Sequence, residues 1–480
     1  MPEADSSILA GLFAVFYVSL AIAASGHAIL KKEDSRAAVA WVGVIWLAPL
    51  MGSLLYLMFG INRIRRRAAE LRGEMPRVDQ GSAVRAYVPE DMGRELPREM
   101  QALARLADRV SRQPLLTGNR LTPLSNGDEA YPRMLEAIAC ARQSITLSTY
   151  IFSNDAVGRD FARSLGQAVR RGVSVRVLVD AVGLRYSVPS IIRHLRRERV
   201  PYARFMPTRT PLAMPFMNLR NHRKMLVVDG LLGFSGGMNI AAGNCVESQP
   251  RHPIRDLHFA IEGPVVAELQ TVFAEDWAFA CRERLNGERW FPKPYAPGST
   301  LSRVIPDGPD ENLDTLRQVI VGALSVARRH VRVMTPSFLP DATVQDALKT
   351  AALRGATVDV VLPLRNNLPM VDWACRGQLE DLLHWGVRVW YSPGDFDHSK
   401  LFTVDGRWCM VGSANWDPRS LRLNFECNLE CYDVRLARSL ERMVDQVRAN
   451  AEALELADLR NAWLPVRLRN GIARLMSPYL

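Results

Sequence analysis

Two stretches of this sequence match each other position by position, and this duplication constrains the fold more than any other feature. Residues 221–239 read NHRKMLVVDGLLGFSGGMN, and residues 397–415 read DHSKLFTVDGRWCMVGSAN. Each copy has a histidine, a lysine two residues later, an aspartate-glycine pair, and a glycine-rich turn that ends in asparagine. A repeat with identical spacing predicts two structural units that fold alike.

The segments that precede the two copies also correspond. SITLSTYIF and VSVRVLVD read as strands, and DFARSLGQAVRRG between them has helical spacing. The same order returns as VRVMTPSFLPD and, further along the chain, LRGATVDVVLP. Alternating strands and helices predict the α/β class. We therefore expect two tandem α/β domains with pseudo-two-fold symmetry, over residues 116–300 and 301–480.

The two copies together supply polar side chains for one site. Residues two apart in a strand face the same side, so the histidine and lysine of each copy project together. The glycine-rich turns allow a ligand to approach the backbone, and the asparagines add neutral hydrogen-bond donors. We expect six of these side chains to meet across the interface of the two domains: His222, Lys224, Asn239, His398, Lys400 and Asn415.

A site of this composition suits a tetrahedral anion such as a phosphodiester. The lysines neutralise phosphate as point charges. One histidine can attack phosphorus while the other protonates the leaving oxygen, because the unperturbed pKa of histidine is about 6.5. A zinc site does not fit, since a lysine beside each histidine repels a cation and the spacing is not that of metal ligands. We therefore expect no metal.

Four carboxylates complete the prediction. Asp229 and Asp405 belong to the paired motifs, but each also precedes a glycine in a dipeptide typical of hairpin turns, so a catalytic and a structural role both stay open. Each histidine also needs a carboxylate to orient its second ring nitrogen. Asp256 and Glu426 lie at matching places, at the start of the strand after each asparagine turn.

The N-terminal residues 1–60 read as a membrane hairpin. Residues 8–30 and 37–60 contain no Lys, Arg, Asp or Glu, and the short stretch KKEDSR lies between these two segments. Each of the two apolar segments is long enough to cross a bilayer as a helix. A cleavable signal peptide is the alternative, but the first residues MPEADSS are acidic where a signal peptide is basic. The sequence therefore predicts two transmembrane helices.

Residues 61–115 are expected to form a juxtamembrane helix and a basic juxtamembrane connector. INRIRRRAAELR, directly after the second span, holds five arginines, among them Arg63, Arg65, Arg66 and Arg67. The loop between the spans holds Lys31, Lys32 and Arg36, and the N-terminal tail holds no basic residue. This distribution favours a cytoplasmic location for the main body of the protein.

Overall charge and cysteine content narrow the partners. The net charge of +11 indicates an anionic partner, which can be nucleic acid, a phospholipid headgroup or a membrane surface. The seven cysteines have irregular spacing and form no CxxC pair, so they predict neither a disulfide framework nor a zinc cluster.

The paired HxK(x)4D(x)6G[GS]xN motifs resemble those of the phospholipase D superfamily. The whole chain is similar to bacterial cardiolipin synthases, through AVAWVGVIWLAPLMGSLLYLMFG, SANWDPRSLRLNFECN and the ending ARLMSPYL. The resemblance implies a multi-pass enzyme of the bacterial inner membrane that needs no cofactor. It would join two molecules of phosphatidylglycerol, releasing glycerol, through a phosphatidyl-histidine intermediate. It implies that His222 is the nucleophile and that His398 acts as acid and then base.

Other functions stay open at this point. After GGMNI the chain reads AAGNCVESQ, where the synthases carry an acidic and aromatic phrase, so hydrolysis or another alcohol acceptor is an alternative. A nucleic-acid phosphodiesterase fits the basic charge but has no need of the apolar N-terminal segments. A catalytically silent membrane scaffold disagrees with two complete motifs. The partners expected are therefore an anionic phospholipid and the membrane, with no nucleic acid, and the oligomeric state is left open.

Overall fold

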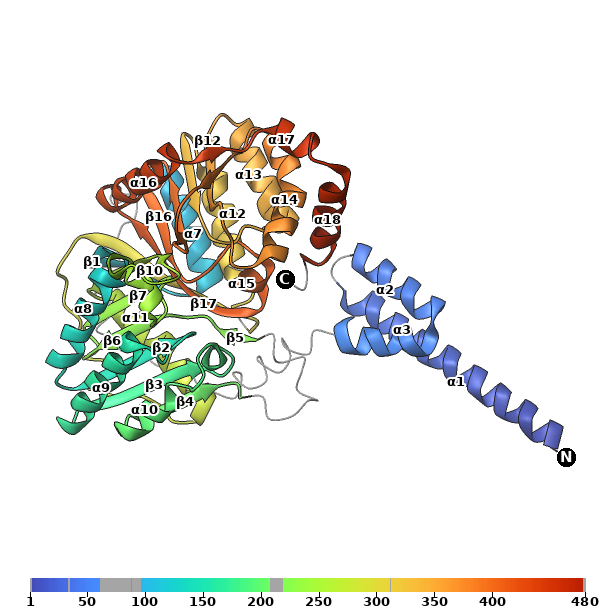
Figure 1. The fold of residues 1–480 in the computed structure, drawn as a ribbon, viewed down its shortest axis with the longest axis horizontal. Coiled ribbons are helices and arrows are strands. Elements are labelled where there is room, and N and C mark those ends of the chain that lie inside the picture. The colour runs from blue at the N-terminus through green and yellow to red at the C-terminus, as the bar shows by residue number, and fades with distance from the viewer. Residues whose placement is uncertain are drawn as a thin grey trace. The chain divides into compact units, whose positions relative to one another are not determined.

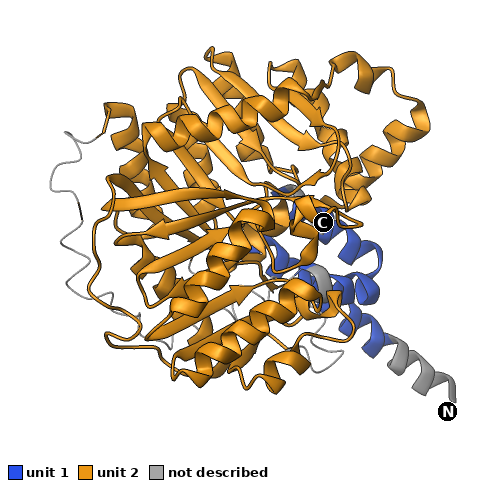
Figure 2. Ribbon diagram, turned by 60° about the vertical axis from the view of Figure 1, so that its left-hand side comes forward, with its two compact units in different colours: residues 1–70, 209–217 blue, residues 71–208, 218–480 orange. Residues whose placement is uncertain are grey.

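The structure is a computed structural model that describes residues 2–32, 35–60, 88, 96–207, 219–310 and 312–477. The chain divides into two compact units, residues 1–70 with 209–217 and residues 71–208 with 218–480 (Figure 2). The four arginines from Arg63 to Arg67, and most of the predicted connector, lie outside the described residues.

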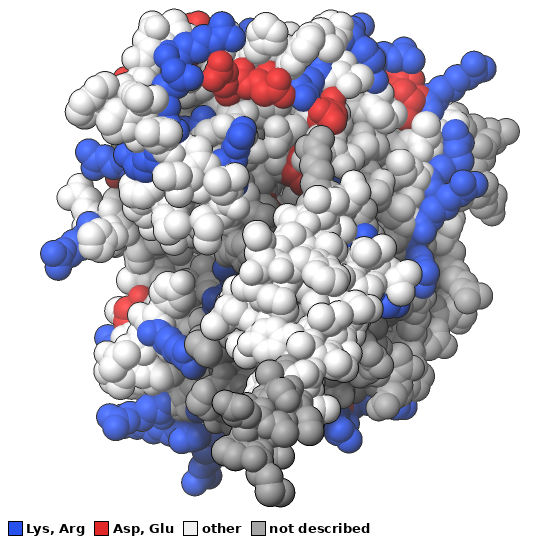
Figure 3. Space-filling model, turned by 90° about the vertical axis from the view of Figure 1, so that its right-hand side faces the viewer, with Lys and Arg blue, Asp and Glu red and all other residues white. Residues whose placement is uncertain are grey.

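The first unit is helical. It contains α1 (Pro2–Lys31), α2 (Ser35–Leu47), α3 (Pro49–Leu55) and the π-helical turn η1 (Tyr56–Gly60), and α1 extends well beyond the two shorter helices (Figure 1). Among the described residues, one helical stretch is long and apolar enough to cross a membrane, Gly11–Lys31. Residues 8–30 and 37–60 of this unit carry no Lys, Arg, Asp or Glu, and Figure 3 shows a broad face of the molecule without charged side chains.

The second predicted span is not one long helix. It breaks at Ala48, because Pro49 has no N–H to donate and disfavours helical backbone in the residue before it. The chain then folds back. Tyr56 shares a hydrogen bond of 2.8 Å with His27 of α1, and its ring packs edge-on against Trp41 in the middle of α2. Gly52 makes this return possible, since a Cβ there would lie 2.3 Å from the carbonyl oxygen of Val44.

The second unit holds two halves that repeat the same order of elements (Figure 1). The first half consists of β1 (Leu116–Ser125), α8 (Asn126–Cys140), β2 (Ser144–Thr149), α9 (Ala156–Arg170), β3 (Ser174–Asp180), α10 (Ile192–Arg197), β4 (Tyr202–Phe205), β5 (Arg220–Asn221), β6 (Met225–Val228), β7 (Leu232–Gly236), β8 (Ile254–Arg255), β9 (Leu257–Glu262) and α11 (Val265–Cys281). The second half consists of β10 (Thr300–Asp307), α12 (Thr315–Val326), β11 (His330–Met334), α13 (Ala342–Leu353), β12 (Thr357–Pro363), α14 (Pro369–His384), β13 (Arg388–Ser392), β14 (Phe396–Asp397), β15 (Leu401–Val404), β16 (Trp408–Gly412), α15 (Pro418–Arg422), β17 (Asn424–Tyr432), α16 (Val434–Ala449), β18 (Glu452–Ala453), α17 (Leu456–Arg460) and α18 (Leu464–Leu475).

All described strands except β8 and β14 form one mixed sheet that runs through both halves. Its order is β18-β13-β12-β11-β15-β16-β17-β10-β1-β9-β7-β6-β2-β3-β4, with β1 and β10 antiparallel neighbours at the centre. Reading outward from that pair, each half presents corresponding strands in the same order. The predicted class, two α/β domains with pseudo-two-fold symmetry, agrees with this arrangement.

Two short parallel pairs join the halves beside the central strands. β5 of the first half pairs with β17 of the second, and β14 of the second half pairs with β8 of the first. Both β5 and β14 directly precede a motif histidine, and both partner segments directly precede a predicted carboxylate. These exchanged pairs position the candidate site.

Each half has its own hydrophobic core, which aliphatic side chains from its strands and helices fill. The second core also receives α7 (Arg98–Ser111), whose buried face includes Met100, Leu103 and Ala107. This helix lies within residues 61–115, where the sequence predicted a juxtamembrane helix and a connector, and it packs on the core of the second half. Its apolar positions, spaced three and four apart, are the pattern of a helix that packs on a core.

Candidate active site

The two motif histidines emerge where the halves exchange strands. The backbone N–H of His222 donates to the carbonyl of Phe425 at 2.9 Å, and that of His398 donates to the carbonyl of Arg255 at 2.7 Å. Each histidine is therefore fixed by the opposite half, one residue before that half's carboxylate. Residues 222 and 224 face one side of the extended backbone, while Asn221 and Arg223 face the other and bind Asp276.

Each imidazole is held by the carboxylate of the opposite half. His222 Nδ1 lies 3.0 Å from both carboxylate oxygens of Glu426, and His398 Nδ1 lies 2.7 Å from Oδ2 of Asp256. A carboxylate only accepts hydrogen bonds, so Nδ1 carries the proton and Nε2 is the free nitrogen in the neutral ring. Asp256 and Glu426 are thus brought to the histidines, but across the interface.

The lysines complete one electrostatic cluster. Lys224 Nζ donates to the carbonyl of its own motif's histidine at 2.7 Å, and Lys400 makes the equivalent bond to His398. Burial lowers the pKa of Lys224 to about 7 and that of Lys400 to about 8, and each ammonium lowers the pKa of the other lysine or of the histidines. The charges of both motifs therefore act on each other in one buried region.

Burial also governs the histidines and their carboxylates. It lowers the pKa of His222 below its ordinary value and, together with the Lys400 charge, lowers the pKa of His398 to about 4. Burial alone would raise the pKa of the two carboxyls. The adjacent histidines and lysines outweigh it, so the pKa values of Asp256 and Glu426 lie below their ordinary range. The empty site thus favours ionised carboxylates and neutral imidazoles.

The two asparagines are not equivalent. Asn239 accepts the backbone N–H of Ile151 through its amide oxygen at 3.0 Å, which turns the amino group of the side chain away from that contact. The amino group of Asn415 lies 3.3 Å from a carboxylate oxygen of Asp417. Both follow directly on the glycine-rich turns, as the sequence predicts.

Asp229 and Asp405 are not brought to the histidines. Each occupies the left-handed region, with φ of 51° and 54°, in a hairpin turn with the glycine that follows. The carboxylate of Asp229 accepts backbone N–H groups of residues 142–144, and that of Asp405 accepts those of residues 328–330. A four-residue strand separates each aspartate from its lysine, about 13 Å of extended chain. Of the two roles left open by the sequence, these contacts match the structural one.

Three further side chains belong to the cluster and were not singled out from the sequence. The Tyr150 ring contacts that of His222 edge-on at 5.1 Å and lies 5.6 Å from Lys224 Nζ. The Ser413 hydroxyl donates to Glu426 Oε2 at 2.5 Å, and Asn424 donates to Oε1 at 3.1 Å. Comparing the two copies could have found the serine, because Gly237 stands at the matching position. A Cβ at Gly237 would lie 2.2 Å from Asp256 Oδ1.

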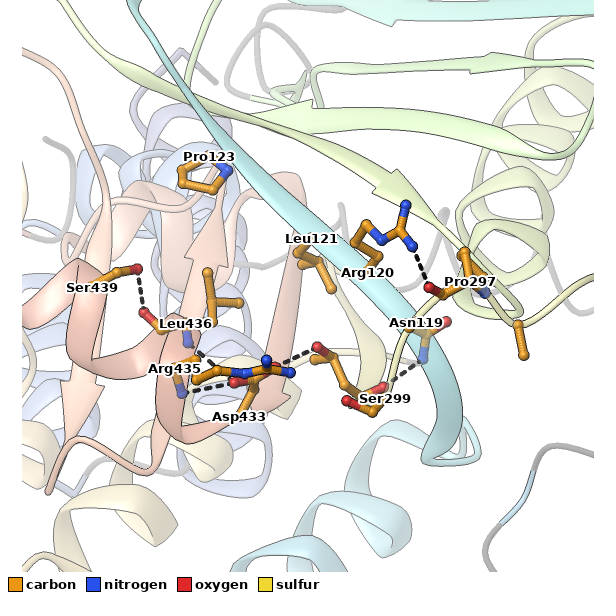
Figure 4. Close-up of a pocket in the computed structure, with 13 residues that line it drawn as sticks. Asn119, Arg120, Leu121, Pro123, Pro297, Ser299, Asp433, Arg435, Leu436 and Ser439 are labelled. Carbon is orange, nitrogen blue, oxygen red and sulfur yellow. Dashed lines mark hydrogen bonds between the residues drawn. The ribbon is translucent and has the colours of Figure 1, made fainter.

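A separate cavity of about 550 Å³ lies near the centre of the sheet (Figure 4). β1, residues 296–300 and the start of α16 line it. Its polar groups bind one another: Arg120 donates to the carbonyl of Pro297, and the Thr300 hydroxyl donates to Asp433 at 2.6 Å. No motif histidine or lysine is among the residues that line it. Elsewhere in the described part of the chain, no group of three or more His, Cys, Asp or Glu side chains is arranged to hold a metal ion.

Comparison with known proteins identifies the family of this chain. A family model described as cardiolipin synthase, PLD-like domain, matches residues 134–277 and 320–448, and a phospholipase D-nuclease N-terminal model matches residues 19–60. The chain is 31% identical over 477 residues to a cardiolipin synthase of Geobacillus kaustophilus, covering 98% of this chain and 94% of that protein.

It is also 33% identical over 482 residues to cardiolipin synthase A of Pseudomonas aeruginosa, covering 99% and 97% of the two chains. Among solved structures, a phosphatidylserine synthase of Haemophilus influenzae superposes with a TM-score of 0.62 at 16% identity, over 79% of this chain and all of that one. That likeness supports the fold. The chain therefore belongs to the cardiolipin synthase family of proteins with phospholipase D-like domains.

Proposed function

We propose that this protein makes cardiolipin from two molecules of phosphatidylglycerol and releases glycerol. The observation that carries the proposal is the pair of buried imidazoles, each bound through Nδ1 by the carboxylate of the opposite half and each beside a lysine. Full-length relatives named cardiolipin synthase support the choice of substrates.

The first half-reaction cleaves the donor lipid. Nε2 of His222 attacks the phosphorus of one phosphatidylglycerol, and the bond from phosphorus to the headgroup glycerol oxygen breaks. When the anionic phosphodiester binds, its charge favours uptake of a solvent proton at Nε2 of His398, and this imidazolium then gives that proton to the glycerol oxygen, so glycerol leaves as a neutral alcohol. Lys224, Lys400 and the asparagine amides stabilise the charge on the phosphoryl oxygens. The product is a phosphatidyl group bound to His222.

The second half-reaction forms cardiolipin. The primary hydroxyl of a second phosphatidylglycerol attacks phosphorus, and Nε2 of His398 takes its proton. The bond between phosphorus and His222 then breaks, which restores the free imidazole. The donor and product are both phosphodiesters of primary alcohols, so the exchange needs no external energy source. Exclusion of water from the site favours transfer to lipid over hydrolysis.

Two asymmetries support His222 as the nucleophile. Its carboxylate, Glu426, also accepts hydrogen bonds from Ser413 and Asn424, which stabilise the ionised form that must balance a phosphoryl-imidazolium. His398 instead has Lys400 Nζ at 2.9 Å from its Nδ1, beside the contact with Asp256. The positive charge of Lys400 makes the protonated ring of His398 a stronger acid, which suits a general acid.

The acceptor lipid brings a second phosphate, and Arg220 is suited to bind it. It lies two residues before His222 on the same face of the chain, and its Nη1 atom is buried without a hydrogen-bond partner among the described residues. Burial and, after it, the Arg220 charge lower the pKa of Arg419 in α15, so a second cation lies close by. Phe396 occupies the corresponding position of the other half, which leaves this extra charge on one side of the site.

Membrane attachment is proposed to come from α1, with α2 and α3 entering and leaving by the same side. The 13 residues of α2 rise only about 20 Å, less than the roughly 30 Å of the hydrocarbon core. The nearby basic residues, Lys31, Lys32, Arg36 and those after η1, would then share the cytoplasmic side with the catalytic body, and the acidic N-terminus would lie outside. A reporter fused to the N-terminus that is active only in the cytoplasm should stay silent; activity there would refute this topology.

The function is tested by lipid analysis of bacterial cells that lack cardiolipin. Cells making the chain should accumulate cardiolipin, and cells making His222→Ala or His398→Ala should not. Accumulation of phosphatidic acid would indicate a hydrolase instead. Purified protein given labelled phosphatidylglycerol, with and without phosphatidylethanolamine, identifies the acceptor. Unchanged lipids together with nuclease activity of the purified protein would overturn the proposal.

A further inference from the structure

Among the described residues, helix α18 (Leu464–Leu475), close to the end of the chain, packs on the catalytic body through one face. Asn470 and Ala473 are buried, and Ala473 packs in a small cluster with Leu339 and with Ala374 of α14. The Arg469 guanidinium lies 4.5 Å from the Trp373 ring centroid, and Arg474 donates to the carbonyl of Gly377 at 3.3 Å. These contacts fix the orientation of the helix about its own axis.

The opposite face exposes an apolar stripe. Its members are large and mostly solvent-exposed: Trp463 77%, Leu464 63%, Leu468 58%, Ile472 64%, Leu475 73% and Met476 43%. At about 100° per residue, the four helical members fall within an arc of roughly 80°. The buried Asn470 and Ala473 lie on the other side of the axis. A helix with this pattern can pack on apolar surfaces through two opposite faces. The catalytic body covers one of these faces, and the exposed stripe is the other.

Arginines border the stripe. Arg467 and Arg474 lie along one edge and Arg469 along the other, and all three are exposed. No Asp or Glu follows Asp458 in the sequence. A helix with an apolar stripe, flanking arginines and a tryptophan at its start has the composition of helices that lie in the headgroup region of an anionic bilayer.

We propose that α18 lies in the surface of an anionic membrane, with its stripe at the acyl-chain boundary and its arginines on lipid phosphates. A second copy of the chain fits this face poorly. A two-fold contact through the stripe would bring the flanking arginines of both copies together, with no acidic residue of this helix to pair with them. The inference stands on the helix itself and does not depend on the reaction proposed above.

This contact would link the membrane surface to the active-site rim. Leu339, which belongs to the same cluster as Ala473, donates its backbone N–H to the carbonyl of Trp416, and its neighbour Phe338 forms a β-bridge with the same tryptophan. Trp416 follows Asn415 of the second motif directly. Docking of α18 therefore holds one asparagine turn at a fixed height above the lipid, apart from the anchor at the N-terminus.

The test uses the full chain reconstituted in vesicles of phosphatidylglycerol and phosphatidylcholine whose acyl chains carry bromine, which quenches nearby tryptophan. The contribution of Trp463 is the difference between the chain and Trp463→Phe. We expect that difference to show quenching, and we expect Leu468→Glu with Ile472→Glu to abolish most of it. Arg467→Gln should weaken it more in phosphatidylglycerol vesicles than in phosphatidylcholine vesicles.

Two controls separate the explanations. Leu353→Glu changes a residue that is equally exposed, 65%, on α13 outside the stripe, and should leave quenching unchanged. His222→Ala should also retain it, so loss of catalysis and loss of membrane contact are distinguishable. The inference fails if Trp463 is not quenched, or if the double glutamate variant is quenched as before. It also fails if Trp463 of the unchanged chain is not quenched and the double glutamate variant converts a dimer to a monomer. That result would identify the stripe as a contact between two copies.

Discussion

His222 and Glu426 come from opposite halves of the chain, yet Nδ1 of the histidine lies 3.0 Å from both oxygens of the carboxylate. His398 and Asp256 repeat the exchange in the other direction, at 2.7 Å. Neither half can therefore assemble an oriented imidazole alone. Folding of the two halves against each other and completion of the site are one event.

Substitutions of the two histidines should have different effects on the rate when the leaving group needs no proton. With a phosphatidyl-p-nitrophenol donor, His398→Ala should still release nitrophenolate, whereas with phosphatidylglycerol it should lose about 10²–10⁴-fold in rate. His222→Ala should fail with both donors, because it lacks the attacking nitrogen. Nitrophenol absorbance and labelled glycerol release measure the two reactions. If His222→Ala keeps nitrophenol release and His398→Ala loses it, the roles are reversed.

Glu426→Gln should slow the step that uses His222 without preventing folding. The amide can still accept the Nδ1 hydrogen bond, but it cannot balance the positive charge of the phosphorylated ring, so we expect kcat to fall by about 10²–10⁴-fold. Ser413→Ala removes only one donor to that carboxylate and should cost about tenfold.

The matching variant of the other half, Asp256→Asn, should act on His398. Its nitrophenol reaction should stay close to that of the unchanged chain, while synthesis from phosphatidylglycerol falls. Equal loss in both assays for both carboxylate variants would contradict the exchanged pairing.

Alkaline pH should weaken capture of the anionic lipid. The pKa of Lys224 is about 7 and that of Lys400 about 8, so the empty site loses positive charge as pH rises through this range. We expect kcat/KM to fall above pH about 8. Lys400→Arg keeps its charge and should move the decline to higher pH. A profile that is flat to pH 10 would show that neither lysine titrates as expected.

Stability should respond to pH in the opposite direction. The folded pKa of each lysine lies below its value of 10.5 in the unfolded chain, so the unfolded state binds more protons in between. The contribution of these groups to the free energy of unfolding therefore rises with pH from about 7 to about 10. Comparing denaturant unfolding of the chain and of Lys224→Met across that window isolates the effect.

Asp405→Asn should reduce stability rather than catalysis. The carboxylate accepts three backbone N–H groups at the start of β11, and an amide can replace it only in part. We expect the free energy of unfolding to fall by about 1–3 kcal/mol, with kcat/KM of the remaining folded protein unchanged. Asp229→Asn in the other half is the matched control and should behave alike. Loss of activity without loss of stability would instead indicate a catalytic role for these two aspartates.

Arg220→Gln should affect the acceptor more than the donor. We expect nitrophenol release in the absence of acceptor to change little, and the KM for acceptor phosphatidylglycerol to rise about tenfold, equivalent to about 1.4 kcal/mol. Phe396→Leu, at the corresponding position of the second half, serves as the control and should leave that KM unchanged. An equal effect on both half-reactions would assign Arg220 to the donor phosphate instead.

The repeat alone determined much of this protein. Two copies with identical spacing predicted two α/β halves, the convergence of the histidines and lysines, and a match to a known family. Such features are local or periodic, and a strand fixes the facing of His222 and Lys224 wherever it lies in the fold. The composition of residues 8–30 likewise predicted a membrane helix, because length and apolarity alone decide that property.

The tertiary structure decided which groups meet. Spacing placed Asp256 and Glu426 in their own halves, but the pairs β5–β17 and β14–β8 cross the interface and exchange them. The sequence likewise gave no sign that α3 would return along α2, which depends on the contact of Gly52 with Val44. The sequence also could not decide whether Asp405 has a structural role in the turn or a catalytic role in the site. Pairings between residues distant in the chain are set by packing of whole elements, and no local pattern records them.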